Sequence, residues 1–171
     1  ITYYFFFLLK MSNIYNSLVE SFHNELEYYD TKHKPCVVFD IDGTILVDGI
    51  YSPKNDDEII KDVYNYLLYL QSIGIDIFII TARPESRENR MGTIDMLIKL
   101  KINYKYLYMW HQNIFRSHIK FKEEARREIF ENGYNVIMSL GDNHWDYGDY
   151  GGLGVHIHNN GEKIEYVDDF L

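Results

Sequence analysis

The chain has 171 residues, of which 46% are hydrophobic and 16% aromatic, and it carries a net charge of −9. This length suffices for a substantial core, and the composition excludes an intrinsically disordered chain. The acidic balance argues against a protein that covers nucleic acid broadly, because nucleic-acid backbones are bound by clustered lysine and arginine. The single cysteine, Cys36, excludes an internal disulfide. We expect it to be buried in a cytoplasmic or other intracellular protein.

Residues 1–10 are an aromatic and aliphatic run that precedes Met11. The run is too short to span a bilayer, and it lacks the basic start and small-residue cleavage site of a signal peptide. We interpret it as a non-native or disordered extension, with a truncated signal as the alternative. We expect residues 11–171 to form one domain without a membrane partner.

The first half of the chain alternates between helical and strand patterns. Apolar residues recur every four positions over residues 13–29, which predicts an amphipathic helix. The apolar run at residues 35–39 predicts a buried strand. Residues 45–55 are rich in turn formers and leave room for a small hairpin flap. A helix over residues 56–72 and a second buried strand over residues 76–80 follow.

The alternation continues to the end of the chain. We predict a helix over residues 85–100, with Met91, Ile94, Leu97 and Ile98 on its apolar side. Further elements are predicted at residues 104–110 (strand), 121–131 (helix), 135–140 (strand), 154–158 (strand) and 163–167 (strand). Strands that alternate with helices imply a mainly parallel sheet covered on both faces, so the predicted fold is a doubly wound α/β domain.

Asp40 and Asp42 follow the first predicted strand and precede Gly43 and Thr44. Aspartate and glycine are depleted in strand interiors, so these residues belong at the carboxyl edge of the sheet, where open α/β sheets bind ligands. Asp40 is the candidate nucleophile toward a phosphate, and Asp42 is the candidate proton shuttle. Gly43 would let backbone N–H groups approach the phosphate. The alternative is an acidic turn after a strand.

Polar residues also follow the second and fourth predicted strands. Thr81 and Ala82 offer a hydroxyl and backbone N–H groups to a phosphate, although threonine is also a common helix N-cap. Asp142 would complete a Mg²⁺ site together with Asp40. Asp146 would orient a ligand or a metal-bound water from outside the direct ligand set, and an acidic loop is the alternative.

Lys122 is the candidate for a fixed positive charge that stabilises the phosphoryl group. Lys120 competes with it if the helix register differs, and a solvated lysine is the ordinary alternative. Arg83 and His144 are candidates for the rim of the substrate pocket. His156 and His158 alternate on a predicted strand, but two histidines without further ligands are weak support for a transition-metal site.

Taken together, these residues resemble the phosphatase branch of the haloacid dehalogenase-like (HAD) hydrolase superfamily. Residues 40–44 (DIDGT) are similar to its first motif and Thr81 to its second. Lys122 is similar to the third motif, and Asp142 with Asp146 to the fourth. Within the superfamily, the stretch TARPESR at residues 81–87 most resembles the class B and plant-type acid phosphatase group.

The resemblance implies a Rossmann-like fold, a Mg²⁺ cofactor and hydrolysis of phosphate monoesters through an aspartyl-phosphate. It also implies that the backbone carbonyl of Asp42 binds the metal. The 36 positions between Thr44 and Thr81 leave no space for a helical cap domain. We therefore expect an open site that takes a large substrate or is closed by a neighbouring subunit.

Other functions fit the same residues. A polynucleotide 3′-phosphatase or a 5′-nucleotidase would use the same chemistry. A local basic rim for nucleic acid could be formed by Arg83, Arg87, Arg90, Lys120, Arg126 and Arg127. A phosphate-binding or phospho-acceptor module without turnover is the non-enzymatic alternative. Asp42 argues against it, because an acid/base beside the nucleophile makes a phosphoenzyme short-lived.

Overall fold

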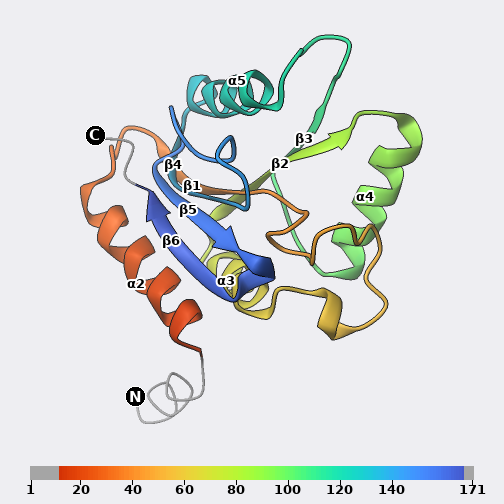
Figure 1. Ribbon diagram of the computed structural model, residues 1–171. Helices are drawn as coiled ribbons and strands as arrows, with labels where there is room; N and C mark the ends of the chain where they lie inside the picture. Colours follow the sequence, from red (N-terminus) through yellow and green to blue (C-terminus); the bar gives the residue numbers. More distant parts are fainter. Residues whose placement is uncertain (1–11, 168–171) are drawn as a thin grey trace.

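The computed structural model describes residues 12–167, so the interpretation of residues 1–10 lies outside the described residues. The described residues form a six-stranded sheet with the order β3-β2-β1-β4-β5-β6 (Figure 1). Strands β1 to β5 are parallel, and β6 pairs antiparallel with β5. This is the predicted doubly wound architecture, in which the strand order reverses between β1 and β4. None of the helices between residues 12 and 167 has the length and apolar character that crossing a membrane requires.

The elements follow one another as the alternating sequence pattern indicates. The strands are β1 (Lys34–Phe39), β2 (Asp76–Pro84), β3 (Tyr106–Trp110), β4 (Tyr134–Gly141), β5 (Leu153–His158) and β6 (Lys163–Val167). The helices are α2 (Asn13–Tyr28), α3 (Lys61–Ser72), α4 (Arg87–Lys99) and α5 (His118–Glu131), with 3₁₀ turns η1 (Asp56–Glu58) and η2 (Asn159–Gly161).

The central strand β1 is buried on both faces, as its unbroken apolar run predicts. Val37 and Phe39 face a large core shared with α2, α3 and α4, whereas Cys36 and Val38 face a smaller core shared with α5. Successive side chains of a strand point to opposite faces, so β1 contributes side chains to both cores. Helix α5 covers the second face because it connects β3 to β4 across β2 and β1.

Residues 45–60 form a flap between β1 and α3. The two arms of the flap pair at its base, with 3.0 Å between Val47 N and Glu58 O. Next to this pairing, the backbone N–H of Asp48 donates to Asn160 Oδ1 at 3.1 Å, which ties the flap to the turn between β5 and β6. No helical cap domain is inserted between β1 and α3, as predicted.

Helices α3 and α4 differ from their predicted form. The helix predicted over residues 56–72 begins at Lys61, because the paired arm of the flap keeps the backbone at Ile59 extended. Residues 56–58 form the separate turn η1.

Helix α4 turns its predicted apolar side only partly to the core, where Leu97 is buried and Ile94 is partly buried as predicted. Met91 and Ile98 are exposed, whereas Thr93, Met96 and Leu97 are buried. Thr93 faces inward, where its hydroxyl accepts a hydrogen bond from the buried Arg83 of β2. Polar contacts of this kind are invisible to a hydrophobic pattern.

Helix α2 contributes directly to the large core, and this contribution can be measured. Phe22 is 0% exposed, whereas Tyr28 on the same helix is 85% exposed. We expect Phe22→Ala to lower the free energy of unfolding by about 3–5 kcal/mol, because the change removes buried apolar surface and leaves a cavity. Tyr28→Ala should change it by less than about 0.5 kcal/mol. Urea denaturation followed by circular dichroism measures both values, and equal effects would show that α2 is not part of the core.

Candidate active site

Asp40 and Asp142 lie side by side at the carboxyl edge of the sheet. Asp40 follows β1 directly and Asp142 follows β4, and these strands are parallel neighbours in which Phe39 pairs with Leu140. The backbone N–H of Asp40 donates to Leu140 O at 3.0 Å, which extends the pairing to the aspartate itself. The register of two strands therefore brings together carboxylates that are about a hundred residues apart in the chain.

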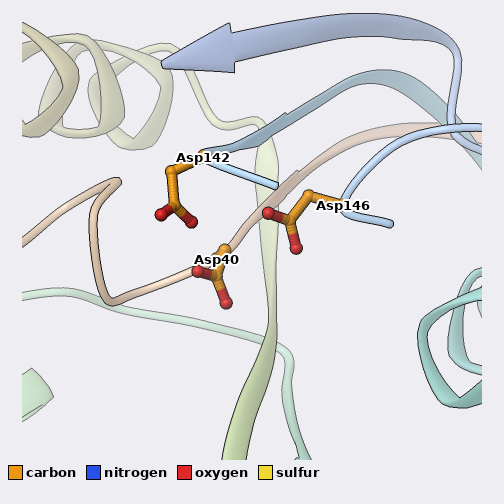
Figure 2. Close-up of side chains that lie close together, drawn as sticks. All are labelled: Asp40, Asp142 and Asp146. Atoms are coloured by element: carbon orange, nitrogen blue, oxygen red, sulfur yellow. The ribbon is translucent and has the colours of Figure 1, made fainter. Parts of the chain in front are cut away.

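Asp146 joins these two residues from the loop after β4. A tight turn returns the chain to the sheet edge, where the backbone N–H of Asn143 donates to Asp146 Oδ2 at 2.9 Å. Gly141 is needed for this approach, because a Cβ at this position would overlap the Asp146 side chain. The carboxylates of Asp40, Asp142 and Asp146 converge, with one oxygen of each within 4.8 Å of the others (Figure 2).

Lys122 reaches the same cluster from α5. The helix begins three residues earlier than predicted, because Ser117 caps it by accepting from the backbone N–H of Lys120. Lys122 then points into the site, where its ammonium donates to Asp40 Oδ1 at 2.8 Å and also to Asp146 Oδ1. Its side chain is 2% exposed, whereas Lys120 faces solvent. The structure therefore places Lys122, and not Lys120, in the aspartate cluster.

The cluster holds more negative than positive charge. Burial raises the pKa of Asp40 to about 8 even though Lys122 opposes the shift. Burial and the nearby Asp146 raise the pKa of Asp142 to about 6. Burial alone would lower the pKa of Lys122, but Asp146 and Asp40 more than offset it, so this pKa is raised. The lysine is therefore held charged between carboxylates that it does not fully neutralise.

This donor set fits a divalent cation. Three carboxylates and one ammonium leave an excess of negative charge, and carboxylate oxygens are the ligands that Mg²⁺ prefers. Both oxygens of Asp146 already accept hydrogen bonds, from Lys122 and from Asn143 N. Asp40 and Asp142 therefore have more free lone pairs for a cation than Asp146 has, although the geometry of the cluster admits all three.

Gly43 lies against the Asp142 side chain just before the flap. Its φ is +74°, a conformation that favours glycine, and a Cβ at this position would overlap the Asp142 carboxylate. The close approach at Gly43 is therefore to Asp142, and the predicted approach of its backbone to a phosphate stays a prediction.

Thr81 and Ala82 lie within β2 and not after it. The strand continues to Pro84, and the N-cap of α4 is Ser86, so Thr81 is not a helix cap. Thr81 is fully buried beside the end of β1, and its hydroxyl accepts from the backbone N–H of Arg83 at 3.2 Å. Ala82 is partly buried next to it.

The prediction that Arg83 lies at the rim of the substrate pocket is wrong, because the residue is buried. Its side chain is 1% exposed and forms a bidentate ion pair with Asp42, in which Nε donates to Oδ2 at 2.8 Å and Nη2 to Oδ1 at 2.7 Å. A guanidinium committed in this way does not form part of an open rim. No spacing or motif in the sequence indicates that these two side chains pair.

The predicted basic rim is largely absent. Arg126 is buried and donates to Trp145 O and Asp149 O, so it holds the loop after β4. Arg90 is paired with Glu85, and Arg127 is paired with Glu124. Sequence reasoning missed the role of Arg126, although its position four residues after Lys122 places both on one helix face.

The predicted histidines lie at the edges of the site. His144 is exposed and lines a pocket of about 330 Å³ together with Trp110, His118 and Trp145. His156 bonds with Tyr147, and His158 with Glu165. Among residues 12–167, the aspartate cluster is the only group of three or more such side chains close enough to share a metal ion.

Comparison with protein families shows to which family the chain belongs. Residues 50–164 match the family described as HAD superfamily, subfamily IIIB (Acid phosphatase), which is more than half of the 171 residues. The chain belongs to this family. The match confirms the resemblance to the acid phosphatase group, and it begins after Asp40 and Asp42, so the placement of these two residues in the site rests on their geometry. A search of curated proteins found no significant match.

Solved structures confirm the HAD-like fold. The class C acid phosphatase from Bacillus anthracis superposes with a TM-score of 0.54 at 22% identity, covering 81% of this chain and 65% of that one. A chain of the Pnkp1/Rnl/Hen1 complex superposes with a TM-score of 0.56 at 26% identity, covering 68% of this chain and 42% of that one. This chain therefore spans less than two thirds of the length of either.

The role of Gly43 beside Asp142 can be tested with a matched pair of variants. Gly43 and Gly49 both have positive φ, but only at Gly43 would a Cβ meet a carboxylate. Gly43→Ala and Gly49→Ala should each cost roughly 1–2 kcal/mol of stability through backbone strain. We expect only Gly43→Ala to weaken Mg²⁺ binding, by about 10- to 100-fold, because it displaces Asp142. Calorimetric titration with Mg²⁺ measures the affinity, and equal affinities for the two variants would contradict this account.

Proposed function

We propose that the protein is a Mg²⁺-dependent phosphate-monoester hydrolase that acts through an aspartyl-phosphate on Asp40. One observation carries the proposal: the Asp40 carboxylate lies between Lys122 and Asp142 at the carboxyl edge of two parallel strands. Membership of the acid phosphatase family supports it. A phosphorylated molecule is therefore the proposed substrate.

The two carboxylate oxygens of Asp40 would have different roles, because only one of them accepts a hydrogen bond from Lys122. Lys122 donates to Oδ1, which leaves Oδ2 as the oxygen that attacks phosphorus. The P–O bond to the alcohol breaks as the new bond to Asp40 forms, and Asp42 gives a proton to the departing oxygen. Asp42 then takes a proton from the water that hydrolyses the aspartyl-phosphate.

The remaining predicted residues would hold the phosphoryl group. The Lys122 ammonium supplies positive charge to the phosphoryl oxygens, and the Thr81 hydroxyl with the Ala82 N–H supplies hydrogen-bond donors. When bound by Asp40, Asp142 and the backbone carbonyl of Asp42, Mg²⁺ would supply the charge that lets a dianionic phosphate approach these carboxylates.

A phosphatase of polynucleotide ends is the second candidate. The structural likeness to the Pnkp1/Rnl/Hen1 RNA repair complex favours it, at 26–27% identity. A site covered by a short flap, without a cap domain, would also admit a polymer end. The net charge of −9 and the pairing of Arg83, Arg90 and Arg127 with carboxylates argue against strong backbone binding.

Replacement of Asp40 tests the proposed chemistry. We expect Asp40→Asn to lower the hydrolysis of p-nitrophenyl phosphate with Mg²⁺ by about 10⁴-fold or more, because an amide is not a nucleophile toward phosphorus. Asp95→Asn, an exposed change on α4, serves as the control and should keep wild-type turnover. Circular dichroism verifies that both variants fold. Turnover by Asp40→Asn at the wild-type rate would refute Asp40 as the nucleophile.

A substrate panel separates the two candidate functions. We expect kcat/KM for p-nitrophenyl phosphate and nucleoside monophosphates to equal or exceed that for a 3′-phosphorylated oligonucleotide at 150 mM salt, because four of the six predicted rim cations are buried or paired with carboxylates. Release of inorganic phosphate measures each rate. A kcat/KM for the oligonucleotide more than tenfold higher than for the small esters, falling steeply as salt rises, would establish the second candidate.

A further inference from the structure

The guanidinium of Arg83 is one of the most fully engaged groups in the described structure. Besides its two bonds to Asp42, Nη2 donates to the carbonyl of Ile50 at 3.2 Å and Nη1 donates to the Thr93 hydroxyl at 3.3 Å. The ring of Tyr51 lies over the guanidinium, 4.3 Å from Cζ to the ring centroid. Three separate segments thus meet at one side chain: the end of β1, the flap and α4.

These contacts leave Arg83 little capacity to bind a substrate. A guanidinium has five N–H donors, and four of them are used: Nε once, Nη2 twice and Nη1 once. Tyr51 covers one face of the group, and the side chain is 1% exposed. The remaining donor belongs to Nη1, on the side of α4 and away from the carboxylate of Asp42.

The same contacts fix the orientation of Asp42. A bidentate pair with a planar guanidinium restrains a carboxylate in its plane, which a single hydrogen bond or a lysine would not do. Each carboxylate oxygen has two lone pairs, and Arg83 uses one on each. The other lone pairs stay available for a proton, so Asp42 is held in one orientation without being blocked.

Arg83 also links Asp42 to the flap. Ile50 and Tyr51 belong to the flap, and their contacts with the guanidinium are among those that hold this part of it near the sheet. A displacement of the flap would therefore remove two contacts of Arg83 and loosen the group that restrains Asp42. The half-exposed Tyr51 forms the outer layer of this arrangement.

We propose that Arg83 is a positioning residue that fixes the Asp42 carboxylate for proton transfer and makes its orientation depend on the closed flap. The proposal rests on the proposed function, in which Asp42 protonates the leaving oxygen while the P–O bond breaks and Asp40 bonds to phosphorus. Asp42 recovers a proton from the water that attacks the aspartyl-phosphate, so the cycle returns the enzyme to its starting state. Arg83 itself exchanges no proton and contacts no reacting atom.

Esters with different leaving groups test this role. A poor leaving group such as the alkoxide of glycerol 3-phosphate needs a proton as it departs, whereas 2,4-dinitrophenolate does not. We expect Arg83→Lys to lower kcat/KM for glycerol 3-phosphate about tenfold more than for 2,4-dinitrophenyl phosphate, since a misplaced acid loses much of the 10²- to 10⁴-fold that general acid catalysis contributes. Asp42→Asn gives the upper limit of this selective loss.

Two controls accompany the measurement. Lys99→Arg changes an exposed cation of α4 that lies outside the proposed site, and it should leave both values of kcat/KM unchanged. Tyr51→Ala removes the flap contact without changing Arg83, and it should show the same selectivity at a smaller magnitude. Because Tyr51 is half-exposed, we expect Tyr51→Ala to fold. If Arg83→Lys does not fold because Arg83 is buried, the Tyr51→Ala variant alone decides the proposal.

The outcomes separate the proposal from its rivals. Equal losses on both esters in the folded variants would mean that Arg83 acts only through stability, and the proposal would fail. A raised KM on both esters with unchanged kcat would mean that the guanidinium binds phosphate, which also refutes it. If wild-type protein hydrolyses neither ester with Mg²⁺, the proposed function fails before Arg83 is tested.

Discussion

Burial of the Lys122 ammonium between Asp40 and Asp146 is the constraint on which the arrangement of the site depends. The three residues come from α5, from the end of β1 and from the loop after β4, and all are almost completely buried. Removing Lys122 would leave two buried carboxylates without their counter-charge, which typically costs several kcal/mol, whereas removing one aspartate leaves Lys122 paired with the other. The loop after β4 and helix α5 are therefore held in register with the sheet by the same contacts that position Asp40.

A second ion pair, between Arg83 and Asp42, organises the other half of the site. The first pair lies within the aspartate cluster, and the second contacts the flap. Asp40 and Asp42 therefore have different electrostatic surroundings, although only one residue lies between them in the sequence. Such a difference is what two carboxylates with different tasks require.

The strand-end residues were predictable because parallel strands direct their carboxyl ends to one edge. Asp40, Thr81 and Asp142 could be assigned to this edge from the apolar runs before them, and the structure places them there. The side-chain partners could not be assigned. Whether Lys122 or Lys120 points inward depends on the starting residue of α5, and the pairing of Arg83 with Asp42 depends on how β2 extends beyond Thr81. The inward turn of Thr93 on α4 likewise follows from its bond to Arg83, which no periodicity encodes.

The hydrogen bond from Asp48 to Asn160 connects the flap to the last hairpin of the sheet. A cleft of about 320 Å³ beside Asp142 is lined by this turn, by the end of β5 and, from the flap, by Asp48. The hydrogen bond between Asp48 and Asn160 therefore joins two sides of the cleft. A longer turn between β5 and β6 would widen the cleft while every carboxylate stayed in place, so the width of the cleft and the arrangement of the carboxylates are separable properties in this architecture.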